Sequence, residues 1–187
     1  MRTETITRVI YTFEELSDKA KQKAIDNLSS INVDYDWWDS VYEDANQVGI
    51  TITSFDLDRN RHAESKICNP EETAELILEN HGQECETYKT AQAFMNEYKP
   101  LKAKFDRIEE INERFSNHHS KLAYKIFDYG EKLENEIDEL KDDFKKSITE
   151  DYSINLQKEY EYLCSDEAIR EHIESNDYEF MEDGKLA

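Results

Sequence analysis

The sequence predicts an α+β protein in which a small antiparallel sheet, built from both termini, packs with helices and carries a long coiled-coil-like helical arm. Alternating β-branched residues predict the strands, most clearly over Ile50–Leu57. Apolar residues three and four positions apart predict the arm. The 187 residues include only 4 Gly and 2 Pro, which is low against ordinary usages of roughly 7% and 5% and indicates few tight loops.

We expect three segments along the chain. Residues 1–98 form an α+β body, residues 99–148 form the arm, and residues 149–187 supply helices and a C-terminal strand that return to the body. A chain of this length suits one domain, or one small domain with an elongated appendage.

The body is predicted to begin with a strand over Thr3–Thr12, which is rich in β-branched residues. Thr12 then caps a helix, because Glu15 follows three residues later as in a capping box. A second helix is expected over Val33–Val48, where apolar residues recur at helical spacing and Gly49 provides the stop.

A β-hairpin is expected next. The alternation over Ile50–Leu57 predicts its first strand, Asp58–Arg61 suits a turn, and His62–Ile67 returns as the partner strand. Asn69 and Pro70 then start a helix as its cap and its first residue.

The arm follows a helix over Glu86–Tyr98, which is expected to end before Pro100. The polar stretch Ser116–Ser120 divides the apolar seam of the arm, so a helical hairpin, a single rod and a seam between two chains are all open. Gly130 weakens the helix locally by about 1 kcal/mol relative to Ala. The seam consists of Leu101, Phe105, Ile108, Ile111, Phe115, Leu122, Ile126, Tyr129, Leu133, Ile137, Leu140, Phe144 and Ile148.

Two helices are expected after the arm, over Asp151–Cys164 and from Asp166 to Glu174. The tail Tyr178–Ala187 alternates briefly around an Asp-Gly turn, which predicts a last strand in the small sheet. Segments from both termini would then meet in that sheet.

The 44 acidic and 23 basic residues give a formal net charge of -21. This excess excludes sequence-independent attraction to DNA or RNA, because phosphates would be repelled, and it argues against a cationic membrane-surface helix. No apolar run approaches about 18 residues, so no membrane span is predicted. Met1–Thr12 has no apolar core after a basic start, so we expect no secretory signal.

The charge is unevenly distributed. Residues 98–148 carry 12 acids and 11 bases, which suits ion pairs between helices of the arm. Residues 67–97 carry 7 acids and 1 base, and residues 149–187 carry 12 acids and 3 bases. Two interpretations are open: the carboxylates keep the chain in solution, or they form a negative surface that docks on a basic partner in the place of nucleic-acid phosphates.

Under the second interpretation, the candidate partner-binding residues are acids outside the apolar seam. They are Asp34, Asp36, Asp39, Glu43, Asp44, Glu71, Glu72, Glu75 and Glu79. The first five are interleaved with Trp37 and Trp38. Their rings either anchor a helix to the sheet or form an exposed hot spot for an Arg-rich partner.

No pattern in the sequence carries catalysis. Each glycine stands alone, so Gly-rich phosphate loops are absent, and there is no nucleophile elbow. An odd number of cysteines without C-x-x-C spacing argues for a reducing compartment and against a disulfide framework. Asp56 and Asp58 would share a strand face, but Arg59 and Arg61 beside them favour ion pairs over a metal. We therefore expect a protein that is not an enzyme and holds no cofactor or metal.

Five segments carry a resemblance: 11–24 (YTFEELSDKAKQKA), 33–38 (VDYDWW), 52–59 (ITSFDLDR), 76–82 (LILENHG) and 178–185 (YEFMEDGK). They resemble a family of small acidic phage and prophage accessory proteins, often labelled antitoxin-like. The resemblance implies a phage accessory gene, the cytoplasm of a bacterial host and a role in protein binding. It brings no catalytic residues with it.

The expected function is anti-defence inhibition. A phage-encoded, non-enzymatic protein would bind a host defence protein or nucleoprotein complex, such as a CRISPR or restriction-type effector, and block its nucleic-acid site or its assembly. The link from small acidic phage proteins to this role is an analogy. The alternatives are an antitoxin that neutralises a basic toxin, a structural oligomer such as a homodimer through the arm, and an enzyme that holds a metal with Asp56 and Asp58.

Overall fold

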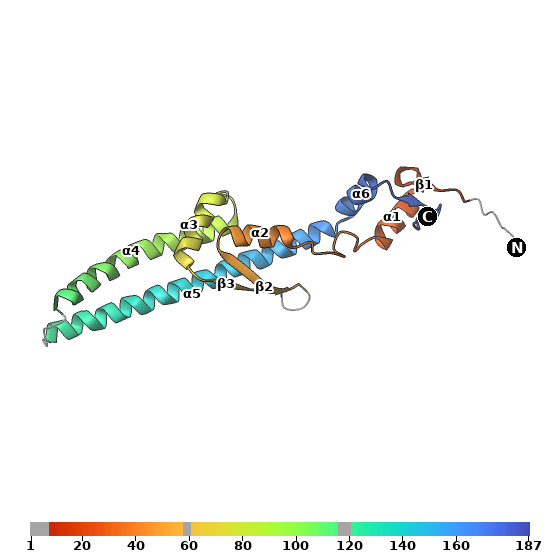
Figure 1. Cartoon of the computed structure of the whole chain (residues 1–187). Coiled ribbons are helices and arrows are strands. Elements are labelled where there is room, and N and C mark those ends of the chain that lie inside the picture. Colours follow the sequence, from red (N-terminus) through yellow and green to blue (C-terminus); the bar gives the residue numbers. More distant parts are fainter. Residues whose placement is uncertain (1–7, 58–60, 116–120) are drawn as a thin grey trace, which may run out of the picture. The chain divides into compact units, whose positions relative to one another are not determined.

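The computed structural model describes residues 8–57, 61–115 and 121–187 (Figure 1). The expected α+β class is confirmed, because helices predominate and short strands pair in antiparallel fashion. Within the described residues the strands form two separate two-stranded sheets instead of the single sheet that the sequence predicted. Each sheet belongs to a different compact unit.

The two compact units have different boundaries from those expected. The first unit comprises Met1–Asp39 and Leu156–Ala187, and the second comprises Ser40–Asn155. The reason is that segments near both ends of the chain build a core of their own. The β-hairpin expected in the body instead belongs to the same unit as most of the long helices.

In the first unit, β1 (Tyr11–Thr12) pairs antiparallel with β4 (Glu179–Phe180), so the expected sheet from both termini is present. The unit also contains the single-turn helix η1 (Phe13–Glu15) and the helices α1 (Asp18–Asn27) and α6 (Asp166–Ser175). Its buried core consists of Phe13, Leu16, Ala20, Ala24, Ile25, Ile169, Ile173 and Phe180.

Thr12 forms the predicted capping box, in which its backbone N–H donates to Oε2 of Glu15 at 2.8 Å. The box starts only the single turn of η1, because Leu16 returns to an extended conformation. Ser17 then caps α1, with its Oγ accepting from the N–H of Ala20 at 3.4 Å. Of the strand predicted over Thr3–Thr12, the described part is residues 8–12, and only β1 within it is a strand; residues 1–7 lie outside the described residues.

The second unit begins with α2 (Asp39–Gln47), whose first residue is assigned to the first unit. The predicted hairpin is confirmed: β2 (Ile50–Asp56) pairs antiparallel with β3 (His62–Ile67), with a bulge between Ile52 and Ser54. The residues 58–60 of the predicted turn lie outside the described residues. Asn69 caps α3 (Pro70–Asn80) as predicted, with Oδ1 accepting from the N–H of Glu72.

Two long helices, α4 (Glu86–Phe115) and α5 (Lys121–Leu163), lie side by side as an antiparallel hairpin (Figure 1). Phe94 stacks on Phe144 with ring centroids 4.4 Å apart. Near the other end of α4, a Cβ added at Gly130 would lie 3.3 Å from Cγ2 of Ile108. The arm is therefore a hairpin within one chain, and its expected tip, Ser116–Ser120, lies outside the described residues.

The helix predicted to end before Pro100 instead continues through it as α4. A proline inside a helix lacks one N–H donor and costs about 3 kcal/mol relative to Ala. The helix packs on α5 both before Pro100, through Phe94, and after it, through Ile108, and local sequence rules take no account of such contacts. In the same way, the helix predicted over Asp151–Cys164 is the last part of α5.

The apolar seam departs from the prediction at Leu122, which is 60% exposed, and at Tyr129. Tyr129 is 49% exposed, whereas Gly130 is buried against α4. The missing side chain at Gly130 lets the two helices approach closely, since a Cβ there would also lie 3.2 Å from Nδ2 of Asn112. In the described parts of the chain, no helix is both long enough and apolar enough to cross a membrane.

Candidate partner-binding surface

The nine candidate acids are divided between the two compact units. Asp34, Asp36 and Asp39 belong to the first unit, and the other six belong to the second. The helix predicted over Val33–Val48 begins only at Asp39, and the residues before it form turns. The prediction of one helix over Val33–Val48 is therefore wrong in its first part, because α2 covers only Asp39–Gln47.

The two tryptophans pack against each other, with ring centroids 5.7 Å apart. Trp37 is 9% exposed, and its ring centroid lies 5.5 Å from that of Tyr160 on α5. This arrangement supports the anchoring role, although the rings pack on a helix and not on the sheet. The exposed aromatic residue of this segment is Tyr35, at 58%, flanked by two candidate acids. The sequence did not single out Tyr35, because the helical spacing of the apolar residues pointed to the tryptophans instead.

Asp44 has a structural partner. The hydroxyl of Tyr152, a fully buried residue on α5, donates to Oδ2 of Asp44 at 2.9 Å. Burial raises the pKa of Tyr152, and the nearby charge of Asp44 and this hydrogen bond raise it further. The carboxylate is half exposed, with 51% of its side chain accessible. Asp44 thus joins α2 to α5 while keeping contact with solvent.

The other oxygen of Asp44 faces His81. Oδ1 lies 3.6 Å from Nε2 of His81, which is close enough for an ion pair but too long for a hydrogen bond. Nε2 accordingly has no hydrogen-bond partner among the described residues. Nδ1 of His81 lies 2.7 Å from Oγ1 of Thr87, whose residue is 3% exposed. We call Asp44, His81, Thr87 and Tyr152 the tyrosine network.

The tyrosine network has the side-chain types of an Asp-His-hydroxyl triad but not the access that catalysis requires. A nucleophile must reach a substrate, whereas Thr87 is buried at the start of α4. The network gives hydrogen-bond partners to the buried hydroxyls of Tyr152 and Thr87, and it leaves Nε2 of His81 without one among the described residues. Thr90 adds a parallel link from α4 to α5, donating to Oδ2 of Asp151 at 2.6 Å.

Two acids of α3 also have structural partners. Oε2 of Glu71 accepts from the hydroxyl of Tyr98 at 2.6 Å, and Tyr98 is 2% exposed. Burial raises the pKa of Tyr98, and its hydrogen bond to Glu71 adds to the effect. Oε2 of Glu72 accepts from Nδ2 of the cap residue Asn69 at 3.2 Å. Both acids therefore stabilise the fold through hydrogen bonds, and the sequence did not predict this role.

The remaining acids of α3 face solvent. Glu75 and Glu79 are exposed, lie one helical turn apart, and form no hydrogen bond or ion pair with a described residue. Asp106 of α4 lies near them, because its charge and that of Glu75 both raise the pKa of Tyr98, but Lys102 of the same helix pairs with it. We call Glu71, Glu75 and Glu79 the acidic stripe.

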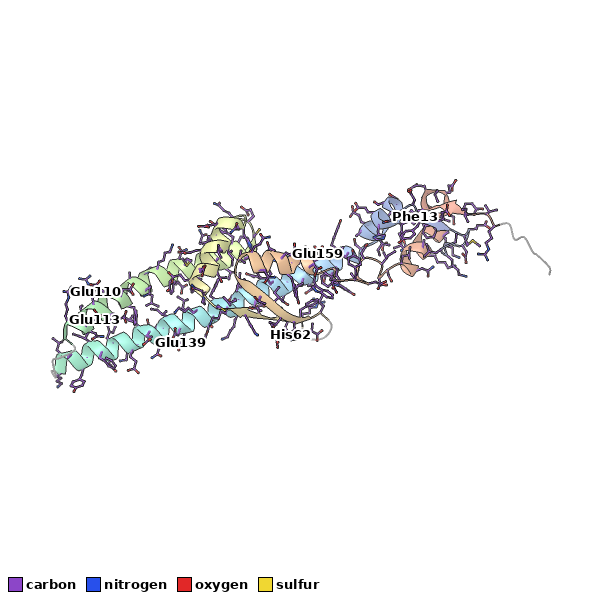
Figure 2. All side chains as sticks on the ribbon, in the orientation of Figure 1. Phe13, His62, Glu110, Glu113, Glu139 and Glu159 are labelled. Atoms are coloured by element: carbon purple, nitrogen blue, oxygen red, sulfur yellow. The ribbon has the colours of Figure 1, made fainter. Side chains whose placement is uncertain are left out.

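Acids of the hairpin differ from those of the acidic stripe, because lysines on the same helix neutralise many of them. Glu110 and Glu113 project from α4, and Glu139 projects from α5 (Figure 2). Five ion pairs between described residues of the hairpin join positions three or four apart on one helix, whereas the sequence predicted pairs between the helices. They are Lys102–Asp106, Lys132–Asp128, Lys141–Asp138, Lys145–Asp142 and Lys146–Asp143.

No metal-binding group of three or more His, Cys, Asp or Glu side chains occurs in the described ranges. Asp56 is exposed on β2, whereas Asp58 lies outside the described residues. Cys68, Cys85 and Cys164 are free thiols.

Comparisons with known proteins identify no relative of this chain. No family model matches the chain, and neither a curated protein sequence nor a solved structure matches it.

Proposed function

We propose that this protein is a phage-encoded, non-enzymatic inhibitor that works in the bacterial cytoplasm. It binds a basic surface of a host defence protein, such as a CRISPR or restriction-type effector, and covers the place where nucleic acid or another subunit would bind. The phage context rests on the resemblance of the sequence segments, and the mode of binding rests on the acidic surface.

The observation that carries the proposal is the pair Glu75 and Glu79. Both carboxylates are exposed and lack a described partner, and they lie in a segment, residues 67–97, that carries 7 acids and only 1 base. Like charges one turn apart on a helix repel each other, so the pair does not stabilise α3. Their charge is available to a basic partner, and complementary charge speeds the encounter of two proteins.

The test is capture of partner proteins from a phage-susceptible bacterial lysate, followed by binding measurements on the purified partner. The variant Glu75→Lys/Glu79→Lys is compared with Glu131→Lys/Glu134→Lys, which makes the same charge change on exposed residues of α5. We expect the first variant to slow association by about tenfold and to reduce its salt dependence, because charges at the rim of an interface act on the encounter. Equal binding by both variants at low and high salt would contradict the proposal.

The identity of the partner separates inhibition from the antitoxin alternative. A nuclease or CRISPR-type subunit whose activity falls on binding supports the inhibitor. A small basic toxin, with rescue of toxicity and no effect on phage growth, supports the antitoxin. Both would use the acidic stripe.

Exposed apolar side chains on the first turns of α5 favour a second role, which is pairing of two chains through the arm. Leu122, Tyr124, Phe127 and Tyr129 are 60%, 66%, 64% and 49% exposed. A second copy fits this region because the arm is nearly neutral in an otherwise acidic chain. We expect a dimer in sedimentation equilibrium that Tyr124→Ser/Phe127→Ser dissociates. A monomer at roughly 100 μM would rule out this role.

A further inference from the structure

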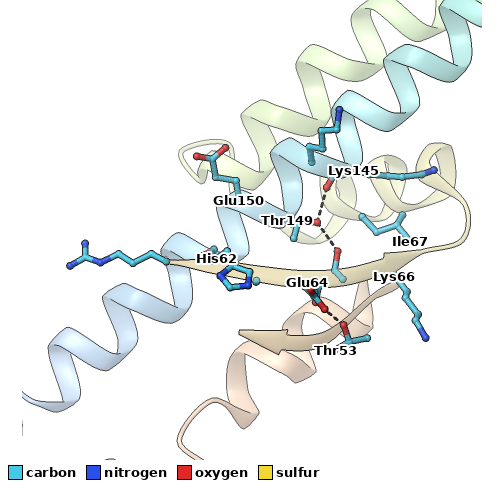
Figure 3. A pocket seen from close by; sticks show the side chains of 13 residues that line it. Thr53, His62, Glu64, Lys66, Ile67, Lys145, Thr149 and Glu150 are labelled. Carbon is cyan, nitrogen blue, oxygen red and sulfur yellow. Dashed lines mark hydrogen bonds between the residues drawn. The ribbon is translucent and has the colours of Figure 1, made fainter. Parts of the chain in front are cut away.

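A groove in the second unit runs between β3 and α5 (Figure 3). It has a volume of about 690 Å³, within the range of roughly 300–1,000 Å³ that ligand sites occupy. Every residue from Arg61 to Ile67 lines one side. The other side is one face of α5, where Lys145, Thr149 and Ser153 follow at four-residue spacing.

The groove follows the edge of β3 and not one of its faces. Neighbouring residues of a strand point to opposite faces, so a groove that touches seven consecutive residues must run along the backbone. β3 pairs with β2 on one side only. On its other side, the described backbone–backbone hydrogen bonds outside the β2–β3 pair include none from residues 63–67. An unpaired edge presents N–H and C=O groups that another extended chain can bind.

The edge is held in place before any ligand arrives. Thr149 donates its hydroxyl hydrogen to the carbonyl oxygen of Lys145 at 2.7 Å. The hydroxyl of Ser65, which lies 2.6 Å from Oγ1 of Thr149, must therefore be the donor in that contact. This link ties the middle of β3 to α5 and forms the floor of the groove. A preformed site avoids the entropy of ordering on binding.

The charge of the groove is opposite to that of the whole chain. Four bases line it, Arg61, Lys66, Lys145 and Lys146, against the two acids Glu64 and Glu150. Lys145 and Lys146 pair with acids of their own helix at 3.0 and 3.5 Å, but the pairs are exposed. Exposed pairs contribute little and can exchange for a ligand carboxylate. The chemistry therefore fits an acidic ligand.

We propose that an extended acidic peptide segment of a partner protein binds in this groove as a third strand on the free edge of β3. Strand addition supplies main-chain hydrogen bonds, and side-chain pockets supply selectivity. The alternation of N–H and C=O along the edge matches a peptide backbone and not a sugar–phosphate backbone. The groove shares no residue with the acidic stripe, so failure of one proposal does not affect the other.

The first experiment uses fluorescence polarisation with an acetylated peptide about as long as β3, in which glutamate alternates with threonine and valine. Salt is held near 0.15 M, where a Debye length of about 8 Å confines electrostatic effects to the groove. We expect Lys145→Gln/Lys146→Gln to weaken binding by about tenfold, since each removes a charge partner. Lys132→Gln/Lys141→Gln, which removes two paired lysines of α5 outside the groove, should leave binding unchanged. Equal losses in both variants would overturn the assignment.

The second experiment tests the main-chain hydrogen bonds directly. An edge strand bonds through every other residue of an added antiparallel strand. Methylation of alternate backbone nitrogens in the peptide should therefore abolish binding in one register and spare it in the other, with new amide-exchange protection confined to 62–67. Equal binding of both methylated peptides, or binding without that protection, would overturn strand addition. No binding by any alternating acidic peptide of a library at millimolar concentration would overturn the proposal as a whole.

Discussion

Asp44 and Glu71 each accept a hydrogen bond from a buried tyrosine, whereas Glu75 and Glu79 on α3 face solvent without a described partner. The sequence presents all four as similar acids on helices. Their surroundings separate them: the first two satisfy hydroxyls that would otherwise be buried without a partner. The charge of a carboxylate therefore says little about its role until its neighbours are known.

The largest expected effect tests the buried side of this comparison. Tyr152→Ala removes a fully buried ring and leaves a cavity, so we expect the free energy of unfolding to fall by about 3–5 kcal/mol. Tyr162→Ala, at a residue of α5 that is 51% exposed, is the control and should change stability by less than about 0.5 kcal/mol. Urea unfolding followed by circular dichroism measures both. Similar midpoints for the two variants would show that Tyr152 is not part of a rigid core.

A smaller effect distinguishes the structural acids from the exposed ones. Asp44→Asn and Glu71→Gln replace a charged acceptor of a buried hydroxyl by a neutral one, which we expect to destabilise by about 1–2 kcal/mol each. Glu75→Gln makes the same replacement of a carboxylate by an amide, but at a side chain that accepts no hydrogen bond from a buried group. The same unfolding measurement should place it within about 0.5 kcal/mol of the parent chain. If Glu75→Gln lowered the free energy of unfolding as much as Glu71→Gln does, structural and exposed acids could not be distinguished in this way.

The tyrosines also make stability depend on alkaline pH. The folded state holds the pKa values of Tyr98 and Tyr152 above the ordinary value of 10.0, so both stay neutral where the unfolded chain ionises. The folded state then binds more protons, and stability is full below about pH 10 and falls as the pH rises beyond it. Tyr98→Phe/Tyr152→Phe should unfold with a flatter pH dependence between about pH 9 and 11. An unchanged pH dependence in that variant would assign the alkaline loss to other groups.

Local signals predicted the elements that local chemistry decides. Asn69 and Pro70 predict the start of α3, and the alternation around Ile50 predicts β2. The failures occur where distant residues decide. Trp37 packs on Tyr160, more than a hundred positions away in sequence, so the helix expected to include it begins later.

The same limit explains the partial success at the candidate surface. Glu75 and Glu79 could be found from charge alone, because neither forms a hydrogen bond or ion pair with a described residue. The roles of Asp44 and Glu71 could not, because Tyr152 and Tyr98 reach them from other helices. The sequence predicts a local weakness of the helix at Gly130, whereas in the structure the missing side chain makes room for Ile108 of α4, which would lie 3.3 Å from an added Cβ.

The smallest expected effect has the opposite sign from the others. Like charges at i and i+4 of a helix destabilise it, so Glu75→Gln/Glu79→Gln should stabilise the chain by about 0.2–0.5 kcal/mol at low salt. Since salt screens exposed charges, the gain should disappear near 1 M salt, where the Debye length is about 3 Å. Thermal unfolding at both salt concentrations measures it. A loss of stability at Glu75 and Glu79 would mean that these carboxylates hold the fold. A gain means that the chain carries them at the expense of its own stability, as expected for residues that serve a partner.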